Sequence, residues 1–379
     1  MRFLHTSDLH LGKRLGEISL YEDQRFILEQ IKDIVFDNKC DALVIAGDIY
    51  QRSDPSAESM ALFSDFIYEL SSKGIIVIAV SGNHDSGLRL SYLSRIVRGS
   101  GVYLSEVFNG SVEKLQVKDG NGKTVNFFLL PFIRPSDVRK HFQDSSVNSY
   151  NEAVRYIVER LETDEKEINV IVAHQFITGS LTCESEETYI GGLDNVDSAV
   201  FQRFDYVALG HLHRPQHAGS DVMRYSGSPL KYSISESDDN KICVLVDIQG
   251  KEDIRIEEIP LTPLHDVIDI HGMFNDIMMM PRSDDYVRIE INDEDVPPDA
   301  RVILSSTLFP NMFRFAVKNS KTSDETVVDI SNDIENRSLM ELFSDFYSLQ
   351  NNGVMPDESR IKVMKDIIEE IKGPENETD

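Results

Sequence analysis

Six short apolar runs between residues 2 and 213 constrain the fold of this chain more than any other feature of its sequence. They are rich in Val, Ile, Leu, Ala and Phe and have the length of strands, a pattern typical of strands buried on both faces of a sheet. The segments that contain them are RFLHTSD, DALVIAGD, IIVIAVSGN, NFFLLPF, INVIVAHQ and DYVALGHLH. Amphipathic stretches such as YEDQRFILEQIKDIVFDN and ESMALFSDFIYELSSKG lie between some of them. Strands that alternate with amphipathic helices predict an α/β fold in which helices cover the sheet.

The organisation of the chain changes twice. The strand candidates KICVLVDI and DIRIEEIP close the α/β core, and we expect them to add to it as antiparallel strands within a domain of residues 1–262. Residues 263–332 hold the strand candidates YVRIEIND and MFRFAVKN around the short helical pattern MFNDIMMM, which predicts a small α+β domain. Residues 333–372 carry two apolar stripes at helical spacing and predict a helix pair. Residues 373–379 are expected to be disordered.

Three bulk features limit the class of protein. No run approaches the roughly 20 apolar residues that cross a bilayer, and the N-terminal MRFLHTSDLHLG does not have the pattern of a signal peptide. The three cysteines, Cys40, Cys183 and Cys243, are widely separated, so we expect reduced thiols in a cytoplasmic protein and no disulfide framework. The formal net charge of −27 repels polyanions and argues against a free-standing nucleic-acid binder.

Polar residues follow five of the six apolar runs at their carboxyl ends. A turn explains any one of these strand ends, but five in one chain, at one level of a sheet, are hard to explain as independent turns. The carboxyl ends of strands in such sheets converge on a common crevice where ligands bind. The sequence therefore predicts a metal site whose candidate ligands are Asp8, His10, Asp48, Asn83, His174, His211 and His213.

The chemistry of this set favours two cations. It contains carboxylates, an amide and imidazoles but no thiolate, which suits Mn²⁺ or Fe²⁺ and tolerates Zn²⁺. Asp8 and His10 are two residues apart, so in an extended segment their side chains reach the same ion. The set is too large for one ion that must also leave room for a substrate. It fits two ions about 3.5–4 Å apart that share one carboxylate, the arrangement used for in-line phosphoester hydrolysis.

The order of motifs, D-x-H, G-D, G-N-H-D, H and G-H-x-H, resembles that of the calcineurin-like metallophosphoesterases. The resemblance implies a β-sandwich flanked by helices with two bound ions. It implies that Asp8, His10, Asp48 and His213 hold the first ion, and that Asp48, Asn83, His174 and His211 hold the second. His84 would then be the catalytic acid or the group that orients the phosphate, and Asp85 would support His84 through a hydrogen bond.

Longer segments resemble one branch of that family, the bacterial SbcD nucleases. They are GNHDSGLRLS, LPFIRPSDVR, YIGGLDNVDSAVFQRFDYVALGHLHRPQ and RYSGSPLKYSISE. The resemblance implies a nuclease subunit for DNA-end processing, recombination and repair, with ATP-dependent exonuclease activity on duplex ends and endonuclease activity on single strands or hairpins. It implies a coiled-coil ATPase of the SbcC type as partner, docked by the helix pair at 333–372, a homodimer of nuclease subunits, and a capping domain at 263–332. Lys231 and Tyr232, in SPLKYS, are further candidates for the edge of the substrate site.

Three other classes of protein are alternatives. Phosphoprotein phosphatases continue the G-D motif into Asp-Arg-Gly, whereas this chain continues as GDIYQRSDPS, which disfavours that class. A phosphodiesterase of cyclic nucleotides or other small molecules would use the same metal ligands, and degradation of linear duplex DNA separates it from a nuclease. A non-catalytic assembly subunit would only position the ATPase, and the complete ligand set argues against it.

Overall fold

The computed structural model describes residues 1–92, 94–119, 122–143, 146–186 and 195–319, with short pairs beyond them at 343–344, 347–348, 355–356, 360–361 and 363–364. The chain divides into two compact units, Met1–Ala316 and Val317–Asp379, and the first contains the elements that position the site. Apart from those short pairs, the helix pair expected at 333–372 and the tail at 373–379 lie outside the described residues.

A six-stranded sheet forms around the first three predicted strands. Strands β1, β4, β5 and β6 are parallel to one another, and β15 and β16 extend the sheet as antiparallel neighbours, as predicted. The strand order is β16 (Asp253–Pro260), β15 (Ile242–Gly250), β1 (Arg2–Thr6), β4 (Ala42–Ala46), β5 (Ile76–Val80) and β6 (Val102–Leu104).

The other three predicted strands form a second six-stranded sheet. Strands β8, β9, β12 and β14 are parallel, while β7 and β13 pair antiparallel at the two edges. The order is β13 (Gln216–His217), β14 (Met223–Tyr225), β12 (Tyr206–Gly210), β9 (Ile168–His174), β8 (Thr124–Leu130) and β7 (Glu113–Lys118).

The two sheets pack face to face as a β-sandwich. Phe3 of the first sheet contacts Phe127 and Tyr206 of the second edge-on, with ring centroids 5.5 and 5.7 Å apart. Side chains of a strand point alternately to its two faces, so Ala42 and Val44 of β4 lie in this inner core. A strand that is buried on both faces needs an apolar run rather than alternation, which is the pattern in the sequence.

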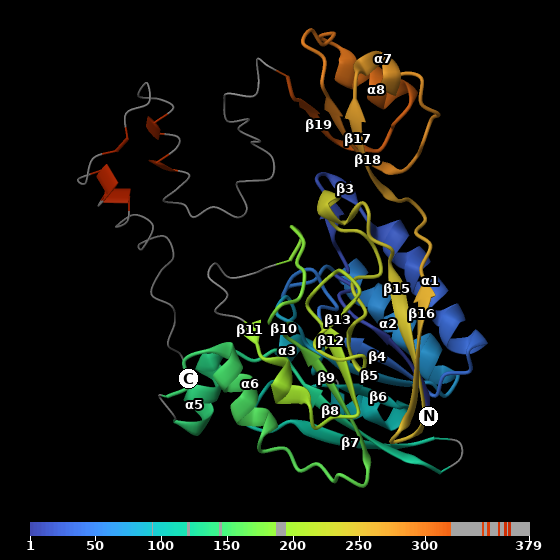
Figure 1. Cartoon of the computed structure of the whole chain (residues 1–379), viewed down its shortest axis with the longest axis vertical. Helices are drawn as coiled ribbons and strands as arrows, with labels where there is room; N and C mark the ends of the chain where they lie inside the picture. The colour runs from blue at the N-terminus through green and yellow to red at the C-terminus, as the bar shows by residue number, and fades with distance from the viewer. Residues whose placement is uncertain are drawn as a thin grey trace. The chain divides into compact units, whose positions relative to one another are not determined.

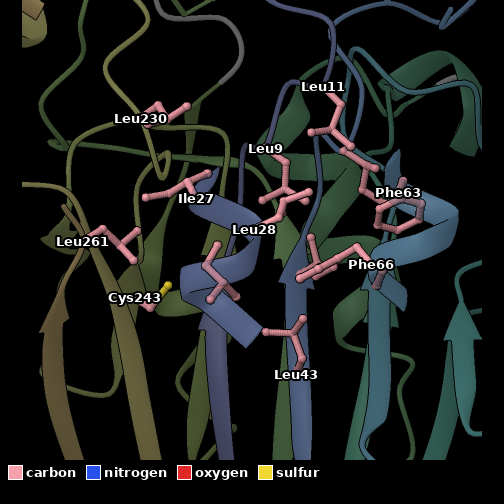
Figure 2. Close-up of a cluster of buried hydrophobic side chains, with 14 of the residues drawn as sticks. Leu9, Leu11, Ile27, Leu28, Leu43, Phe63, Phe66, Leu230, Cys243 and Leu261 are labelled. Carbon is pink, nitrogen blue, oxygen red and sulfur yellow. The ribbon is translucent and has the colours of Figure 1, made fainter. Parts of the chain in front are cut away.

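Helices α1 (Tyr21–Asp37) and α2 (Ala57–Ser72) cover the outer face of the first sheet. Ile27 and Leu28 of α1, with Phe63 and Phe66 of α2, pack against the outward side chains of β4, among them Leu43 (Figure 2). Full burial of an apolar side chain of this size stabilises a fold by roughly 1.5–3 kcal/mol. This second core fixes the helices to the strands whose ends carry the candidate ligands.

Helices α5 (Pro135–Phe142) and α6 (Tyr150–Val158) cover the second sheet, on the other side of the sandwich from α1 and α2 (Figure 1). Helix α6 begins at Tyr150 because Ser149 accepts a hydrogen bond from the N–H of Glu152, whose carboxylate accepts from the N–H of Ser149. The expected helix-flanked β-sandwich is therefore confirmed.

A smaller sheet with two helices follows the sandwich, drawn in orange in Figure 1. Its elements are β17 (Val267–Gly272), α7 (Phe274–Ile277), β18 (Tyr286–Ile291), α8 (Ala300–Thr307) and β19 (Met312–Val317). Strands β17 and β18 are parallel, and a core of its own includes Ile289 and Leu304. The domain boundaries expected at 262/263 and 332/333 stay predictions.

Short elements complete the described chain. They are β2 (Arg14–Leu15), β3 (Ile18–Ser19), α3 (Gly87–Leu90), α4 (Ser94–Val97), η1 (Arg98–Ser100), β10 (Phe176–Ile177), β11 (Asn195–Val196), η2 (Ser198–Phe201) and η3 (Ile234–Glu236). None of the helices within the described ranges combines the length and the apolar character that a bilayer span requires.

Candidate metal centre

Five strand ends from the two sheets deliver polar side chains to one edge of the sandwich. Asp8 and His10 follow β1, Asp48 follows β4, Asn83 to Asp85 follow β5, His174 ends β9, and His211 and His213 follow β12. The backbone of these loops is joined, because Asp8 donates its N–H to the Gly47 carbonyl at 3.0 Å and His10 donates to the Asp48 carbonyl at 2.9 Å.

The first group of facing side chains is Asp8, His10 and His213. Their nearest oxygen and nitrogen atoms all lie within 4.8 Å of one another, and all three residues are buried. Nε2 of His10 and Nε2 of His213 are 3.0 Å apart. These are three of the four ligands expected for the first ion.

The second group lies on the other side of Asp48. Nε2 of His174 is 3.2 Å from Oδ2 of Asp48, and Oδ1 of Asn83 is 3.0 Å from both Nε2 of His174 and Nδ1 of His211. Oδ2 of Asp48 is also 3.6 Å from Nε2 of His10. Asp48 thus lies between the two groups, and all seven candidate ligands are brought together.

The donor atoms of this cluster fit a divalent cation. Two imidazole nitrogens face each other across 3.0 Å, and Oδ1 of Asn83 faces two more. Nδ1 of His174 faces the Ala46 carbonyl, so the single N–H of the neutral ring lies on Nδ1, and the lone pair on Nε2 is directed at Oδ1 of Asn83. Nδ1 of His10 is, moreover, a buried nitrogen that has no hydrogen-bond partner among the described residues. Convergent carboxylate, amide and imidazole lone pairs are what a hard or borderline divalent metal ion requires.

Burial and charge set the protonation of these groups. Burial lowers the pKa of His211 to about 3 and that of His10 well below its ordinary value, so both are neutral, the form that binds metals. Burial raises the pKa of Asp8 to about 6. Burial also disfavours the ionised form of Asp48, but the neighbouring His174 outweighs it and holds the pKa of Asp48 well below its usual range. In turn, Asp48 raises the pKa of His174 to about 9, although burial alone would lower it. Binding of a metal ion through His174 would release the proton that this raised pKa retains.

The backbone at the candidate ligands is unusual. Left-handed φ angles occur at Asp8 (54°), His10 (43°), Asp48 (49°) and His211 (104°). Non-glycine residues rarely adopt this conformation, and such strain concentrates at functional sites, where the surrounding fold maintains it. The sequence predicts an extended segment at Asp8 and His10, with both side chains directed the same way. The left-handed φ angles of these two residues differ from that expectation.

Glycine is required where the loops approach one another. A Cβ atom at Gly82 would overlap Oδ1 of Asp48, and one at Gly210 would overlap the carbonyl oxygen of Ala46. The glycine of the G-N-H-D motif therefore lets the end of β5 contact the Asp48 carboxylate, and that of the G-H-x-H motif lets the end of β12 approach the end of β4.

His84 occupies the position between Asp48 and the outside. Its Nδ1 is 3.0 Å from the Gln51 carbonyl oxygen, its backbone N–H donates to Oδ1 of Asp48 at 3.0 Å, and its Nε2 is 4.0 Å from Oδ2 of Asp48. A carbonyl oxygen only accepts, so Nδ1 carries a proton and Nε2 is directed to the site.

The structure corrects the expectation that a hydrogen bond from Asp85 orients His84. The Asp85 carboxylate accepts the backbone N–H groups of Ile49, Tyr50 and Gly82 at 3.1, 2.9 and 2.9 Å, and the Gln51 carbonyl is the group that holds the His84 ring. Asp85 thus acts through the backbone, by joining the loop after β4 to the loop after β5. Adjacent backbone donors outcompete a side chain on the same turn.

Lys231 and Tyr232, the candidates for the edge of the substrate site, both have partners within the fold. Tyr232 is 3% exposed and donates its hydroxyl to the Leu9 carbonyl at 2.5 Å, with its ring 5.6 and 5.7 Å from those of His10 and His213. Lys231 forms an ion pair with Asp266 at 2.9 Å. Tyr232 thus packs behind His10 and His213, and Lys231 is held by Asp266.

Comparison with known proteins decides the family. The calcineurin-like phosphoesterases match residues 1–215, which contain every candidate ligand. The chain belongs to this family. The SbcD subunit of the nuclease SbcCD from Staphylococcus epidermidis is 31% identical over 348 residues, covering 87% of this chain and 92% of that protein. This chain is therefore an SbcD homologue within the calcineurin-like family, a metal-dependent hydrolase of phosphodiester bonds that uses divalent cations.

Two solved structures are more distantly similar to this SbcD homologue. A dimetal phosphatase from Danio rerio is 14% identical, with a TM-score of 0.45 over 70% of this chain and 98% of that one. A phosphoesterase from E. coli is 13% identical, with a TM-score of 0.27 over 69% of this chain and 100% of that one.

Proposed function

We propose that this chain is the nuclease subunit of an SbcCD-like complex and hydrolyses DNA phosphodiester bonds with two divalent cations. The observation that carries the proposal is the meeting of five strand ends in one buried cluster, in a chain whose relative is a nuclease subunit. The activities we assign are ATP-dependent exonuclease on duplex ends and endonuclease on single strands and hairpins, in DNA-end processing within the cytoplasm.

The ligand sets follow from the two groups around Asp48. The first cation is held by Asp8, His10, Asp48 and His213, and the second by Asp48, Asn83, His174 and His211. The distances of 3.0 to 3.6 Å between facing atoms of these residues support this division. A mixed set of oxygen and imidazole ligands favours Mn²⁺.

The chain's own residues supply the acid. Two cations, when bound, lower the pKa of water and neutralise the phosphodiester. His84 is held by the Gln51 carbonyl through Nδ1, which leaves Nε2 to donate a proton to the departing oxygen. The Asp48 carboxylate lies 4.0 Å from Nε2 and balances the positive charge of the protonated ring. Asp85 fixes the turn that carries Asn83 and His84 through its backbone hydrogen bonds.

The acidic composition implies a partner. A net charge of −27 opposes the approach of DNA, so we assign much of the DNA-binding surface to a coiled-coil ATPase of the SbcC type. Residues 333–372 are the proposed docking segment for it, and the nuclease subunit is proposed to act as a homodimer in a heterotetramer.

The test is a cleavage assay of the purified chain with Mn²⁺, Mg²⁺ or Zn²⁺, with and without the partner ATPase. Substrates are a linear duplex, a DNA hairpin and a chromogenic phosphodiester. We expect Mn²⁺-dependent degradation of DNA that increases with the partner and ATP. Cleavage of the chromogenic diester without any cleavage of DNA would indicate a small-molecule phosphodiesterase, and no hydrolysis of any substrate would indicate an assembly subunit.

A further inference from the structure

The outward nitrogens of the imidazoles at the candidate metal centre are held in different ways. Nδ1 of His174 lies 2.8 Å from the Ala46 carbonyl oxygen, and Nδ1 of His84 lies 3.0 Å from the Gln51 carbonyl oxygen. A carbonyl only accepts, so each contact places the proton on Nδ1. Nδ1 of His213 is instead 2.7 Å from the hydroxyl oxygen of Ser185, a group that both donates and accepts. The serine alone does not decide which nitrogen of His213 carries the proton.

A buried carboxylate removes this ambiguity. The Ser185 hydroxyl donates to Oε1 of Glu236 at 2.6 Å. A hydroxyl has one hydrogen, and an ionised carboxylate accepts only, so the hydrogen of Ser185 is engaged by Glu236. Its oxygen must then accept from Nδ1–H of His213. Nε2 of His213 is left with a lone pair, and this is the atom 3.0 Å from Nε2 of His10.

The position and charge of Glu236 are fixed by its surroundings. Glu236 is 0% exposed and forms an ion pair with Lys241 at 2.5 Å. Its Oε1 also accepts the backbone N–H of Tyr232 at 3.2 Å. Lys241 donates to the His213 carbonyl at 2.8 Å and to the Ser228 hydroxyl at 3.0 Å. Removing an ion pair from water has a high desolvation cost, and this network offsets it with hydrogen bonds on both partners.

The backbone of His213 is held by a second carboxylate. Its N–H donates to Oε1 of Glu186 at 2.6 Å. With Glu186 on the N–H, Lys241 on the carbonyl and Ser185 on the ring, the residue is fixed at three points. The first two contacts fix where His213 lies. Only the third determines which ring nitrogen faces the first cation.

We propose that Glu236, acting through Ser185, is a positioning residue that sets the tautomer of His213 and presents Nε2 to the first cation. The proposal rests on the ligand set of the proposed function. Outer partners of metal-bound histidines of this kind change metal affinity by about 10- to 100-fold when removed. Nothing in the short motif around His213 identifies Ser185 or Glu236, because they lie 28 and 23 residues away from it in the chain.

The test is Mn²⁺ binding to the full chain by isothermal titration calorimetry, with Ser185→Ala as the central variant. This substitution leaves the Glu236–Lys241 ion pair in place and removes only the hydroxyl. We expect the affinity for one of the two Mn²⁺ ions to fall about 10- to 100-fold. The melting temperature of the metal-free protein should not change, and Ser185→Thr should recover the Mn²⁺ affinity. Ser306→Ala is the control, because the Ser306 hydroxyl donates to the Ile303 carbonyl at 3.2 Å within α8 of the smaller sheet.

Glu236→Gln in the wild-type and Ser185→Ala backgrounds tests the path itself. If Glu236 acts through Ser185, the double variant binds the first ion no more weakly than Ser185→Ala, whereas a separate structural role makes the losses add. Wild-type affinity in Ser185→Ala, or no recovery in Ser185→Thr, overturns the proposal even if the Glu236 variants do not fold. Failure of the wild-type chain to bind two Mn²⁺ ions is a different result, and it contradicts the proposed function itself.

Discussion

His84 differs from the buried histidines around it in its access to solvent. Its side chain is 12% exposed, against 0% for His174 and 1% for His10. A side chain that contacts a substrate must be accessible from solvent, whereas a metal-binding side chain enclosed by other metal-binding side chains need not be. This difference in exposure supports His84 as the acid of the proposed reaction.

The His84→Gln variant separates catalysis from metal binding. General acid catalysis contributes about 10²- to 10⁴-fold, so we expect the rate of DNA cleavage to fall by that factor while two Mn²⁺ ions still bind. Single-turnover cleavage and calorimetric titration measure the two properties. His217→Gln is the control, because His217 is half-exposed and pairs with Asp221. A loss of Mn²⁺ that parallels the loss of rate would make His84 a ligand.

His5 gives the fold a pH dependence of its own. It is buried between the Tyr206 hydroxyl at 3.0 Å and the Leu209 carbonyl at 3.2 Å, and burial lowers its pKa to about 3. The unfolded chain takes up a proton at His5 below about pH 6.5, and the folded chain does not until about pH 3. Stability is therefore lost as the pH falls from 6.5 toward 3, by about 2 kcal/mol at pH 5.

The His5→Gln variant tests this loss. Urea unfolding of the chelated protein, followed by circular dichroism from pH 7.5 to 5, should show a free energy of unfolding that falls less steeply than in the wild type. The difference in slope approaches one proton, about 1.4 kcal/mol per pH unit. Parallel slopes for the two proteins would exclude His5 as the titrating group.

At the scale of strands and turns, close approach of the loops makes the site. Gly82→Ala places a Cβ against Oδ1 of Asp48 and must displace either the carboxylate or the turn. We expect loss of Mn²⁺ binding by at least tenfold, since Asp48 serves both groups of ligands. Gly99→Ala is the control, because a Cβ there meets no atom of the described residues within 4 Å. Equal Mn²⁺ affinities for the two variants would mean that the approach of Gly82 to Asp48 is not needed.

The strands and the edge on which they converge were predictable from local sequence, because a strand buried on both faces needs a continuous apolar run. All six predicted strands occur, and so do the helices expected at α1 and α2. The partners behind the ligands were not predictable. Glu236 reaches His213 only through the fold of two loops, and the Gln51 carbonyl that holds His84 has no side-chain signature. Left-handed φ angles at Asp8 and Asp48 likewise arise from contacts between distant strands.

At the scale of the whole first unit, Asp23 joins the sandwich to the smaller sheet. Asp23 is buried in α1 and accepts from the Tyr286 hydroxyl at 2.6 Å and from the backbone N–H of His265 at 3.1 Å, while Nδ1 of His265 lies 3.0 Å from it. A cavity of about 170 Å³ lies at this junction, and its lining includes all three residues. Val267 and Tyr286 of the smaller sheet share a buried apolar cluster with Leu20 of the sandwich, and the hydrogen bonds of Asp23 add to this packing.

The Asp23→Ala variant should loosen this junction. It leaves the buried Tyr286 hydroxyl without its acceptor, at a cost of about 1–3 kcal/mol. We therefore expect amide hydrogen exchange in residues 261–266 to accelerate by about tenfold or more. Asp33→Ala, an exposed position on the same helix, is the control. Unchanged exchange in that segment would show that Asp23 does not hold the two sheets together.

The central claim is that seven side chains from five strand ends hold two divalent cations. Anomalous diffraction from crystals soaked in Mn²⁺ measures this directly. We predict two peaks about 3.5–4 Å apart, both in contact with Asp48. One peak also contacts Asp8, His10 and His213, and the other contacts Asn83, His174 and His211. A single peak, or Mn²⁺ bound elsewhere with none at Asp48, would contradict it.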